Sequence, residues 1–422
     1  MASARVVIIG GGVIGLCAAY YCARRGWRVT VVERNGARRD GCSFQNAGMI
    51  VTSHFVPLAA PGMVALALKW MWNPASPFYV KPRLSPDLLA WGYRFWRAAT
   101  KEHVRRAAPL LRDLSEASQR CYDELAALPG SDFGLVKKGL LMLCRSRHAL
   151  DEETRTAEMG RALGIDSQVL DASAVAALEP GIRMDVAGGV YFPQDHHLTP
   201  DRFVTQLQDR LAAEGVEFVW NTEVAGWRIE RDRRVRAVAT RDGHDIEGDE
   251  YVLCGGSWTP RIARQLGLTV PIEAGKGYSL TLSNPRRIPM TCAILAEARV
   301  AVTPMGGALR FAGTMEIAGL NEDINPVRVR GIVAAAQDYY PEIRAADFEG
   351  VVPWRGLRPC SPDGMPYVGR TARFANLSIA AGHAMMGMSL GPVTGRLIAE
   401  VLAGETPRID LTQLSPDRYA RQ

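Results

Sequence analysis

A glycine-rich turn directly after a short apolar strand constrains this chain more than any other feature of its sequence. Residues 6–9 are a β-branched run suited to a buried parallel strand, and G-G-G-V-I-G then leads into a helix-forming stretch at 16–25. Gly10 permits a tight turn, Gly12 lets backbone amides approach a pyrophosphate, and Gly15 allows the helix to pack closely on the strand. The sequence therefore predicts a β-α-β unit that binds a dinucleotide.

The residues around this turn supply the other parts of such a site. Val13 and Ile14 open the helix, whose unpaired N–H groups and partial positive charge suit phosphates. A second strand at 28–32 leads to Glu33, whose carboxylate can accept hydrogen bonds from ribose hydroxyls, with Arg34 beside it. A glycine turn in an ordinary β-α-β unit is the alternative. The motif alone does not separate FAD from NAD, although its N-terminal position favours FAD.

Length and composition narrow the class of protein. A chain of 422 residues exceeds what one compact core usually supports, so two domains are expected. The net charge of +6 is mild and no basic run is interleaved with aromatic residues, which argues against a nucleic-acid partner. Eight cysteines form no C-x-x-C pair, so no metal site is predicted and a reducing, cytoplasmic location is expected. Glycines at the centre of the apolar run 6–23 argue against a signal peptide or membrane helix.

Two further segments carry a family resemblance. They are G-C-S-F-Q-N-A-G-M-I at 41–50 and W-R-G-L-R-P-C-S-P-D-G-M-P-Y-V-G at 354–369. With the glycine turn, they make the chain resemble the D-amino acid oxidase and glycine oxidase superfamily, and within it the bacterial D-amino acid dehydrogenases. The resemblance implies an α/β (mixed α+β) fold: a Rossmann-type FAD-binding domain from discontinuous segments and a mainly antiparallel-sheet substrate domain.

The chain can be divided to match that expectation. Residues 1–55, 148–268 and 353–422 are assigned to the FAD-binding domain, and residues 56–147 and 269–352 to the substrate domain.

Local patterns predict individual elements within these segments. A long amphipathic helix is expected at 101–128, with further helices near 151–163 and 201–214. Residues 269–352 are expected to form strands, two of them joined by the turn at 305–307.

The resemblance also implies which residues contact the cofactor. A loop around the diphosphate and flavin, the strand beside adenine, a second glycine turn and a segment near the flavin ring would contribute Ser43, Asn46, Ala47, Gly48, Met49, Val224, Gly255, Trp258, Gly382, Met386, Gly387 and Met388. Cys360 does not align with the cysteine that attaches flavin in sarcosine oxidase relatives. The predicted cofactor is therefore noncovalent FAD, without a nicotinamide partner.

Amino acid oxidation requires a carboxylate anchor, and Arg358 in G-L-R-P has the position that holds the substrate carboxylate in the resembling enzymes. Its structural alternative is an ion pair with a neighbour such as Asp363. The helix beginning near Met388 is expected to stabilise charge on the flavin. His383 lies in the same segment and is expected to form hydrogen bonds rather than act as a base.

Tyr278 and His54 are the remaining candidates for the substrate pocket, and both could equally be packing or polar-rim residues. The glycine oxidase branch has a tyrosine in the strand that here reads V-A-V-T at 300–303, and this chain has none there. That departure favours the dehydrogenase branch.

The implied reaction is FAD-dependent oxidative deamination of D-amino acids by hydride transfer from Cα to flavin N5. The sequence motifs at 53–62 and 382–387 resemble those of the subgroup that acts on cyclic substrates such as D-proline or hydroxy-D-proline. The alternatives are an oxidase of sarcosine, other N-alkyl glycines or glycine that uses O2, an NAD-dependent enzyme, and a catalytically silent FAD-binding subunit. The expected electron acceptor is a quinone or dye rather than NAD.

An aromatic segment at 66–97 mixes Trp, Tyr and Phe with Lys and Arg. Aromatic rings with basic neighbours suit a membrane interface, and a membrane quinone would require such proximity. A packed lid and interdomain surface is the expected structure of this segment, and peripheral contact with the inner face of the membrane is the alternative.

Overall fold

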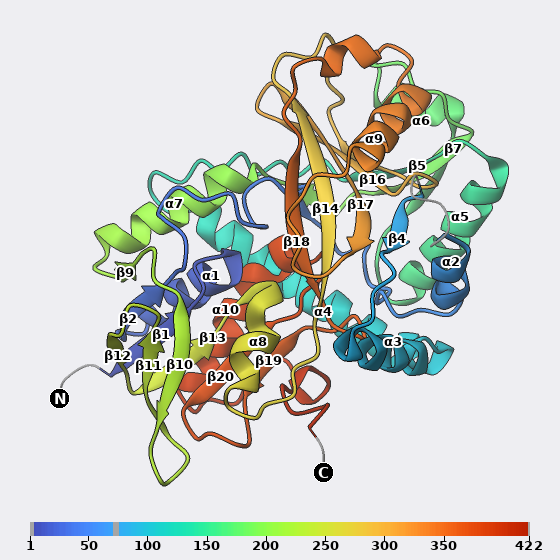
Figure 1. The fold of residues 1–422 in the computed structure, drawn as a ribbon. Coiled ribbons are helices and arrows are strands. Elements are labelled where there is room, and N and C mark those ends of the chain that lie inside the picture. The colour runs from blue at the N-terminus through green and yellow to red at the C-terminus, as the bar shows by residue number, and fades with distance from the viewer. Residues whose placement is uncertain (1–3, 71–75, 421–422) are drawn as a thin grey trace.

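The computed structural model describes residues 4–70 and 76–420, and two sheets organise them (Figure 1). The first sheet has the order β19-β20-β13-β1-β2-β9, in which all neighbours are parallel except the antiparallel pair β19 and β20. Its strands are β1 (Arg5–Ile9), β2 (Arg28–Val32), β9 (Glu217–Val219), β13 (Glu250–Leu253), β19 (Tyr367–Arg370) and β20 (Leu377–Ala381).

Both faces of this six-stranded sheet are covered, which explains its continuous apolar strands. Val6 and Ile8 face a core built with four helices, whereas Val7 and Ile9 face a second core on the opposite side. The helices of the first core are α1 (Val13–Ala23), α4 (Lys101–Ala126), α7 (Pro200–Ala213) and α10 (Gly387–Leu402). The second core is covered by β10 (Val224–Ile229), β11 (Val235–Thr240), β12 (Asp245–Glu247) and α8 (Thr259–Arg264).

The second sheet has nine strands in the order β18-β14-β17-β16-β15-β5-β7-β6, with β4 paired to β17. Its strands are β4 (Phe78–Val80), β5 (Leu140–Cys144), β6 (Gln168–Asp171), β7 (Gly188–Phe192), β14 (Glu273–Leu282), β15 (Cys292–Leu295), β16 (Val300–Met305), β17 (Ala308–Ile317) and β18 (Trp354–Cys360). The helix α9 (Pro326–Tyr339) packs on one face of this sheet (Figure 1).

The remaining elements are short or peripheral. They are β3 (Met49–Ile50), β8 (His196–His197), α2 (Met63–Trp70), α3 (Pro86–Ala98), α5 (Arg147–Ala162), α6 (Ala172–Leu178) and the 3-10 turns Gly256–Trp258, Ala345–Phe348 and Thr412–Leu414. Within residues 4–70 and 76–420, no helix combines the length and the apolar character needed to cross a bilayer.

Several predicted elements are confirmed. The strand, helix and strand at the N-terminus are β1, α1 and β2; the long helix is α4; and the hairpin around 305–307 joins β16 to β17. The strand prediction for 269–352 was wrong at 326–339, which form α9. Asn325 caps this helix by accepting a hydrogen bond from Val327 N, and Pro326 occupies its first turn, so a start signal was present in the sequence.

The expected domain boundaries differ from the sheet topology. Residues 148–268 were assigned to the FAD-binding domain, but β6 and β7 pair with each other and with β5 in the nine-stranded sheet. The reason is that β7 is apolar on both faces and is buried between two neighbours. Conversely, α4, assigned to the substrate domain, packs against α10 and belongs to the core of the six-stranded sheet.

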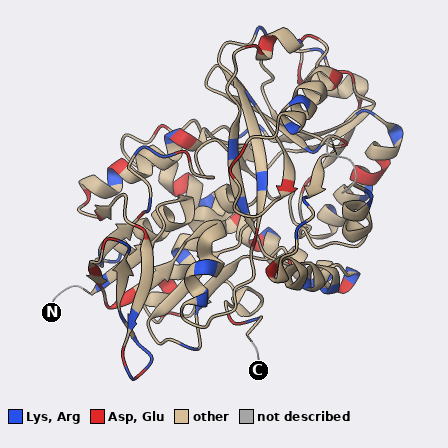
Figure 2. Ribbon diagram, viewed as in Figure 1, with Lys and Arg blue, Asp and Glu red and all other residues tan. Residues whose placement is uncertain are grey.

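Charged residues are interspersed over both halves of the molecule rather than gathered on one face (Figure 2). The basic stretch at 231–236 lies at the exposed turn between β10 and β11 and the start of β11.

Candidate functional site

The main cavity lies at the carboxyl ends of β1 and β2 and is lined by residues from both sheets; its volume is about 380 Å³. A crevice at the strand ends of an α/β sheet is the usual ligand position of such folds. The cavity brings together 15 residues proposed from the sequence, namely Gly10, Gly12, Val13, Ile14, Glu33, Arg34, Ser43, Asn46, Val224, Gly255, Trp258, Arg358, His383, Gly387 and Met388.

The glycine turn has the geometry that its sequence predicted. Gly10 has a φ of +110°, and a Cβ atom there would lie 2.4 Å from the Cys254 carbonyl oxygen. A Cβ atom on Gly15 would lie 1.9 Å from the Gly10 carbonyl oxygen, so only glycine allows α1 to approach the turn this closely. The N-terminal end of α1 therefore opens onto the cavity, where its amides can bind an anion.

The Glu33 carboxylate is buried at the end of β2 and is held by two backbone donors. Gly11 N donates to its Oε2 atom at 2.7 Å, and Asn35 N donates to its Oε1 atom at 2.9 Å. Each oxygen retains a lone pair for a further donor, which is what a ribose diol supplies. Beside it, the Arg34 guanidinium lies 3.5 Å from the centre of the Trp258 ring.

The 41–49 loop is fixed from within and from the nine-stranded sheet. Asn46 Nδ2 donates to Ser43 O at 2.9 Å, and Gly48 N donates to Asn46 Oδ1 at 2.8 Å. Three sheet side chains also donate to consecutive carbonyl oxygens of the loop, at 2.8, 3.0 and 2.7 Å; the pairs are Ser279 with Gln45, Arg310 with Asn46 and Thr303 with Ala47. The side chain of Asn46 therefore shapes the loop, and the second sheet holds it against the cavity.

Arg358 lines the cavity from β18. Its Nη1 atom donates to the Thr314 carbonyl oxygen at 2.8 Å, the only hydrogen bond of this guanidinium among the described residues. The alternative ion pair with Asp363 is not formed, because Asp363 instead receives Nε and Nη2 of Arg418 at 2.7 and 3.0 Å. Arg358 thus offers unpaired donors to an anionic group in the cavity.

His383 lies between β20 and α10 and is buried. Its Nε2 atom is 3.0 Å from Thr394 Oγ1, whereas Nδ1 has no partner among the described residues. Desolvation lowers the pKa of this imidazole to about 3, so His383 is neutral near pH 7. A neutral imidazole with an open Nδ1 atom can form a hydrogen bond to a ligand but cannot supply a positive charge.

Two catalytic candidates do not line the main cavity. Tyr278 is 1% exposed, and its hydroxyl donates to Glu316 Oε2 at 2.7 Å on the opposite face of the nine-stranded sheet from Arg358. His54 follows β3, and its Nδ1 atom contacts Ser53 Oγ at 3.2 Å. Desolvation lowers the pKa of His54 to about 4. Sequence reasoning could not place Tyr278, because a shift of one residue in register turns a strand side chain to the other face. His54 lies outside the strands, in the segment after β3, so no strand pattern placed its side chain.

The other cofactor candidates are not among the residues that line the cavity. They are Gly15, Ala47, Gly48, Met49, Gly382 and Met386. Gly48, with a φ of +68°, would place a Cβ atom 2.2 Å from Leu198 O, and Gly382, with a φ of +80°, would place one 2.8 Å from the Tyr367 ring. Close packing therefore requires glycine at both positions.

Sequence reasoning missed Arg39 and Asp40 at the cavity. Arg39 Nη2 donates to Gly11 O at 2.5 Å, and burial lowers the pKa of its guanidinium. Arg355 joins the two sheets, pairing with Asp40 and, at 2.7 Å, with Glu322. For Arg39 and Asp40, the only available signal was the R-R-D triplet between Glu33 and the 41–49 loop, which belongs to no regularly spaced motif.

FAD fits the residues present. The cavity combines the glycine turn with a buried ribose-type carboxylate, and Gly387 and Met388 bring the N-terminus of α10 to it beside the open Nδ1 atom of His383. The turn suits a diphosphate, the carboxylate suits a ribose, and a helix N-terminus suits a group that becomes negatively charged.

Comparisons with known proteins identify the family of the chain. The chain matches the family described as FAD dependent oxidoreductase over residues 5–401. It is 35% identical to a D-amino acid dehydrogenase of Methylobacterium radiotolerans, covering 98% of this chain and 99% of the relative, and 34% identical to one of Methylobacterium nodulans, covering 99% of both. Its fold is similar to glycine oxidase from Geobacillus kaustophilus, with a TM-score of 0.78, 24% identity and coverage of 99% and 100% of the two chains. The chain therefore belongs to the family of FAD-dependent oxidoreductases.

Proposed function

We propose that this chain catalyses FAD-dependent dehydrogenation of D-amino acids. The observation that carries the proposal is Arg358, an arginine with unpaired donors in the same cavity as the glycine turn and His383. An arginine can bind a carboxylate through two parallel hydrogen bonds. Full-length relatives named D-amino acid dehydrogenase support the choice of substrate class.

In the proposed reaction, the substrate loses its Cα hydrogen with two electrons and its amine loses a proton, so that a C=N bond replaces the C–N bond. Bound FAD supplies the two-electron acceptor. Arg358 holds the carboxylate and thereby orients Cα. His383 is neutral with a pKa of about 3 and is not needed as a base if the amine gives its proton to solvent first. Water then hydrolyses an acyclic imino acid to a 2-oxo acid and ammonia.

The experiment is an assay of the FAD-loaded protein with a panel of D- and L-amino acids, including both prolines and sarcosine. We expect D-enantiomers to reduce an artificial dye and to yield 2-oxo acid. Rapid consumption of O2 with formation of peroxide would instead identify an oxidase, and sarcosine as the only substrate would identify an N-alkyl glycine enzyme. A yellow protein that oxidises no member of the panel would be a silent FAD-binding subunit.

We further propose that cyclic D-amino acids are among the substrates. Pro359 and Ala384, which line the cavity around Arg358 and His383, are small and support room for a ring at Cα. The expected result is a higher kcat/KM for D-proline than for D-alanine. The opposite order would contradict this narrower proposal and leave the dehydrogenase function intact.

The electron acceptor is proposed to be a membrane quinone, reached through α2 and α3 at the inner face of the membrane. Leu89, Tyr93 and Trp96 are 68%, 58% and 60% exposed, and their spacing places them on one face of α3. The other side of α3 packs Trp91 and Phe95 into a cluster that also contains Met315, Cys360 and Ala384, close to the main cavity. Exposed Lys69, Lys81 and Arg97 lie nearby in sequence and suit anionic lipid headgroups. Trp72, also in the aromatic segment, lies outside the described residues.

Sedimentation with phosphatidylglycerol vesicles tests this contact. The parent protein is expected to bind at low salt and to dissociate as salt screens the basic residues. L89Q/Y93Q/W96Q is expected to lose binding. V169Q/I229Q/V352Q replaces apolar residues elsewhere that are 41%, 49% and 84% exposed, and it is expected to bind like the parent. A parent protein that stays in the supernatant would contradict the proposal.

The cofactor is proposed to be noncovalent. Cys360 is fully buried in β18 and does not line the main cavity. Release of all FAD by acid precipitation is the expected result, and flavin retained on the denatured chain would contradict it.

A further inference from the structure

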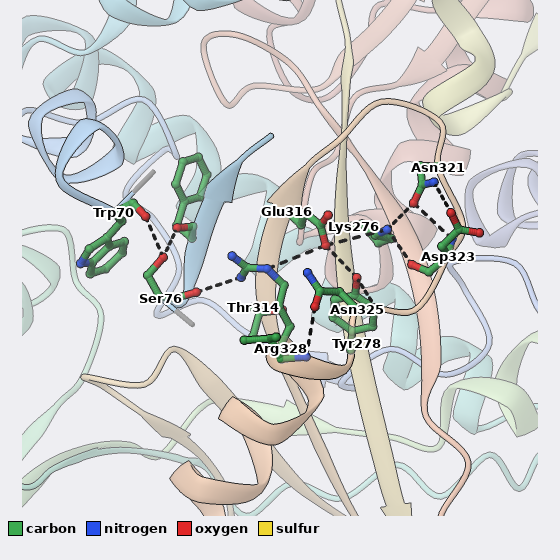
Figure 3. A network of polar contacts seen from close by, with 12 residues as sticks. Trp70, Ser76, Lys276, Tyr278, Thr314, Glu316, Asn321, Asp323, Asn325 and Arg328 are labelled. Carbon is green, nitrogen blue, oxygen red and sulfur yellow. Dashed lines mark hydrogen bonds and ion pairs between the residues drawn. The ribbon is translucent and has the colours of Figure 1, made fainter. Parts of the chain in front are cut away.

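A buried ionic cluster lies within the nine-stranded-sheet half of the molecule (Figure 3). The strand pairing places it on the opposite face of the sheet from Arg358. Its centre is the Glu316 carboxylate of β17, whose Oε2 atom accepts from the Tyr278 hydroxyl at 2.7 Å and lies 3.8 Å from both Lys276 Nζ and Arg328 Nε. All four side chains are less than a tenth exposed. They are called the Glu316 cluster below.

The two cations of the cluster are anchored to two separate segments outside it. Lys276 Nζ donates to Asn321 Oδ1 at 2.6 Å and to Asp323 O at 2.7 Å, so it is fixed to the segment after β17. Arg328, in the first turn of α9, donates from Nη1 to Ser76 O at 2.8 Å. Figure 3 shows the side chains of Lys276 and Tyr278 from β14 and of Arg328 from α9 pointing toward the carboxylate, with the Ser76 carbonyl on the far side of Arg328. Glu316 is therefore held in place by several different elements.

An irregularity of β17 lies directly beside this anchor. Lys276 of β14 pairs with Glu316, whereas Tyr278 pairs with Gly313, so Thr314 and Met315 of β17 together lie opposite the single residue Gly277, one residue more than regular pairing has. Thr314 has a φ of +60°, an uncommon conformation for a β-branched residue that the surroundings must maintain. The bulge re-aims the backbone at this point.

The bulge places a backbone carbonyl oxygen, that of Thr314, beside the guanidinium of Arg358. Thr314 O accepts from Arg358 Nη1 at 2.8 Å. On the same face, a Cβ atom on Gly277 would lie 1.9 Å from Arg358 Nη1, so the guanidinium lies directly over β14. Because Gly277 alternates with Lys276 and Tyr278, those two side chains point to the opposite face. The Glu316 cluster therefore has no direct access to a ligand beside Arg358, and its route to the cavity is the Thr314 backbone.

We propose that Glu316 is a positioning residue for substrate binding: the cluster holds the bulge of β17, and the bulge fixes the guanidinium of Arg358 at the angle that receives the carboxylate. This rests on the proposed function of Arg358. Removing the negative charge of Glu316 leaves two buried cations without their carboxylate, which disfavours the observed packing. The bulge would then relax, and Arg358 would lose its fixed orientation.

The test uses the FAD-loaded protein and benzoate, a carboxylate that has no Cα hydrogen to lose and is followed by its perturbation of the flavin absorbance. Glu316→Gln and Tyr278→Phe are expected to raise the Kd for benzoate and the KM for a D-amino acid by roughly 5- to 20-fold, with kcat changed less than about twofold. Glu316→Asp keeps the charge and is expected to lie between Glu316→Gln and the parent.

A matched control separates positioning from general stability. Glu179 is also a buried glutamate of the nine-stranded-sheet half, and it accepts Met290 N and Thr291 N, each at 2.7 Å. Glu179→Gln is expected to lower the melting temperature without changing the Kd for benzoate.

Parent-like benzoate binding by Glu316→Gln, or by Tyr278→Phe if the first variant does not fold, would overturn the proposal. Arg358→Ala is measured alongside them. If Arg358→Ala binds benzoate like the parent while the Glu316 variants bind it weakly, the proposed role of Arg358 fails, and with it the route from the cluster to the substrate.

Discussion

Arg358 and His383 line the same cavity, but their environments give them different chemical roles. Arg358 has one backbone partner and offers its remaining donors to the cavity. His383 is desolvated, with its pKa lowered to about 3, and is held at Nε2 by Thr394. The first residue can bind an anion, and the second can form a neutral hydrogen bond.

Arg358→Ala is expected to raise the KM for D-amino acids roughly 10- to 100-fold, because hydrogen bonds to charged groups contribute about 1.5–3 kcal/mol. Arg358→Lys keeps the charge but loses the paired donors, so its KM is expected to lie between those of Arg358→Ala and the parent. Steady-state kinetics with a dye as acceptor measures both variants. An unchanged KM in Arg358→Ala would show that the carboxylate binds elsewhere.

The depressed pKa of His383 also predicts how stability varies with pH. The folded pKa of about 3 lies below the unfolded value of about 6.5, so protons bind preferentially to the unfolded chain. The stabilisation is fully present above the unfolded pKa and is lost as pH falls toward the folded one, by at most about 1.4 kcal/mol per pH unit.

Urea unfolding across this range is therefore expected to show a shallower acid slope for His383→Gln than for the parent. His148→Gln, at an exposed position, is the control and is expected to keep the parental slope. Equal slopes for His383→Gln and the parent would contradict the burial argument.

At the scale of elements, the contact of α1 with α10 brings both helix N-termini to the cavity. A Cβ atom on Gly395 of α10 would lie 2.4 Å from the Cys17 carbonyl carbon of α1, so the two helices approach through a glycine. The N-terminal glycine turn was predictable because the spacing of its glycines, within one short segment between a strand and a helix, is a known motif. The Gly395 contact was not, because it depends on where two distant helices cross.

Gly395→Leu is expected to lower stability by about 1–3 kcal/mol, since the helices must move apart. FAD content is expected to fall as well, because both N-termini line the cavity. Gly92→Ala is the control: an added Cβ atom meets nothing within 4 Å in α3, so this change is expected to be neutral or stabilising. A thermal melt that ranks the two variants the other way would contradict this packing argument.

At the scale of the whole molecule, the 41–49 loop joins the two sheets. Ser279, Arg310 and Thr303 all belong to the nine-stranded sheet, yet they bind carbonyl oxygens of a loop that follows β2. The sequence predicted the loop from its Asn and Gly residues. It could not predict the sheet donors, because each is an ordinary strand residue whose partner is distant in sequence. The assignment of β6, β7 and α4 to the wrong domains has the same cause, because contacts between residues far apart in the sequence decide to which sheet each element belongs.

Thr303→Val removes one of these donors at nearly constant volume. A neutral hydrogen bond contributes about 1 kcal/mol, so the Kd for FAD is expected to rise roughly fivefold. Fluorescence titration of the apoprotein with FAD measures this. Val302→Ala, in the apolar core on the opposite side of β16, is expected to lower stability with less effect on the Kd for FAD. Unchanged FAD binding in Thr303→Val would mean that the sheet does not hold the loop.

The most direct measurement is anaerobic flavin bleaching by paired D- and L-enantiomers, recorded for the parent and for Arg358→Ala. The account predicts that D-enantiomers bleach the flavin of the parent and that Arg358→Ala requires a much higher concentration of the same substrate. Bleaching by L-enantiomers alone, or an Arg358→Ala variant with the concentration dependence of the parent, would contradict it.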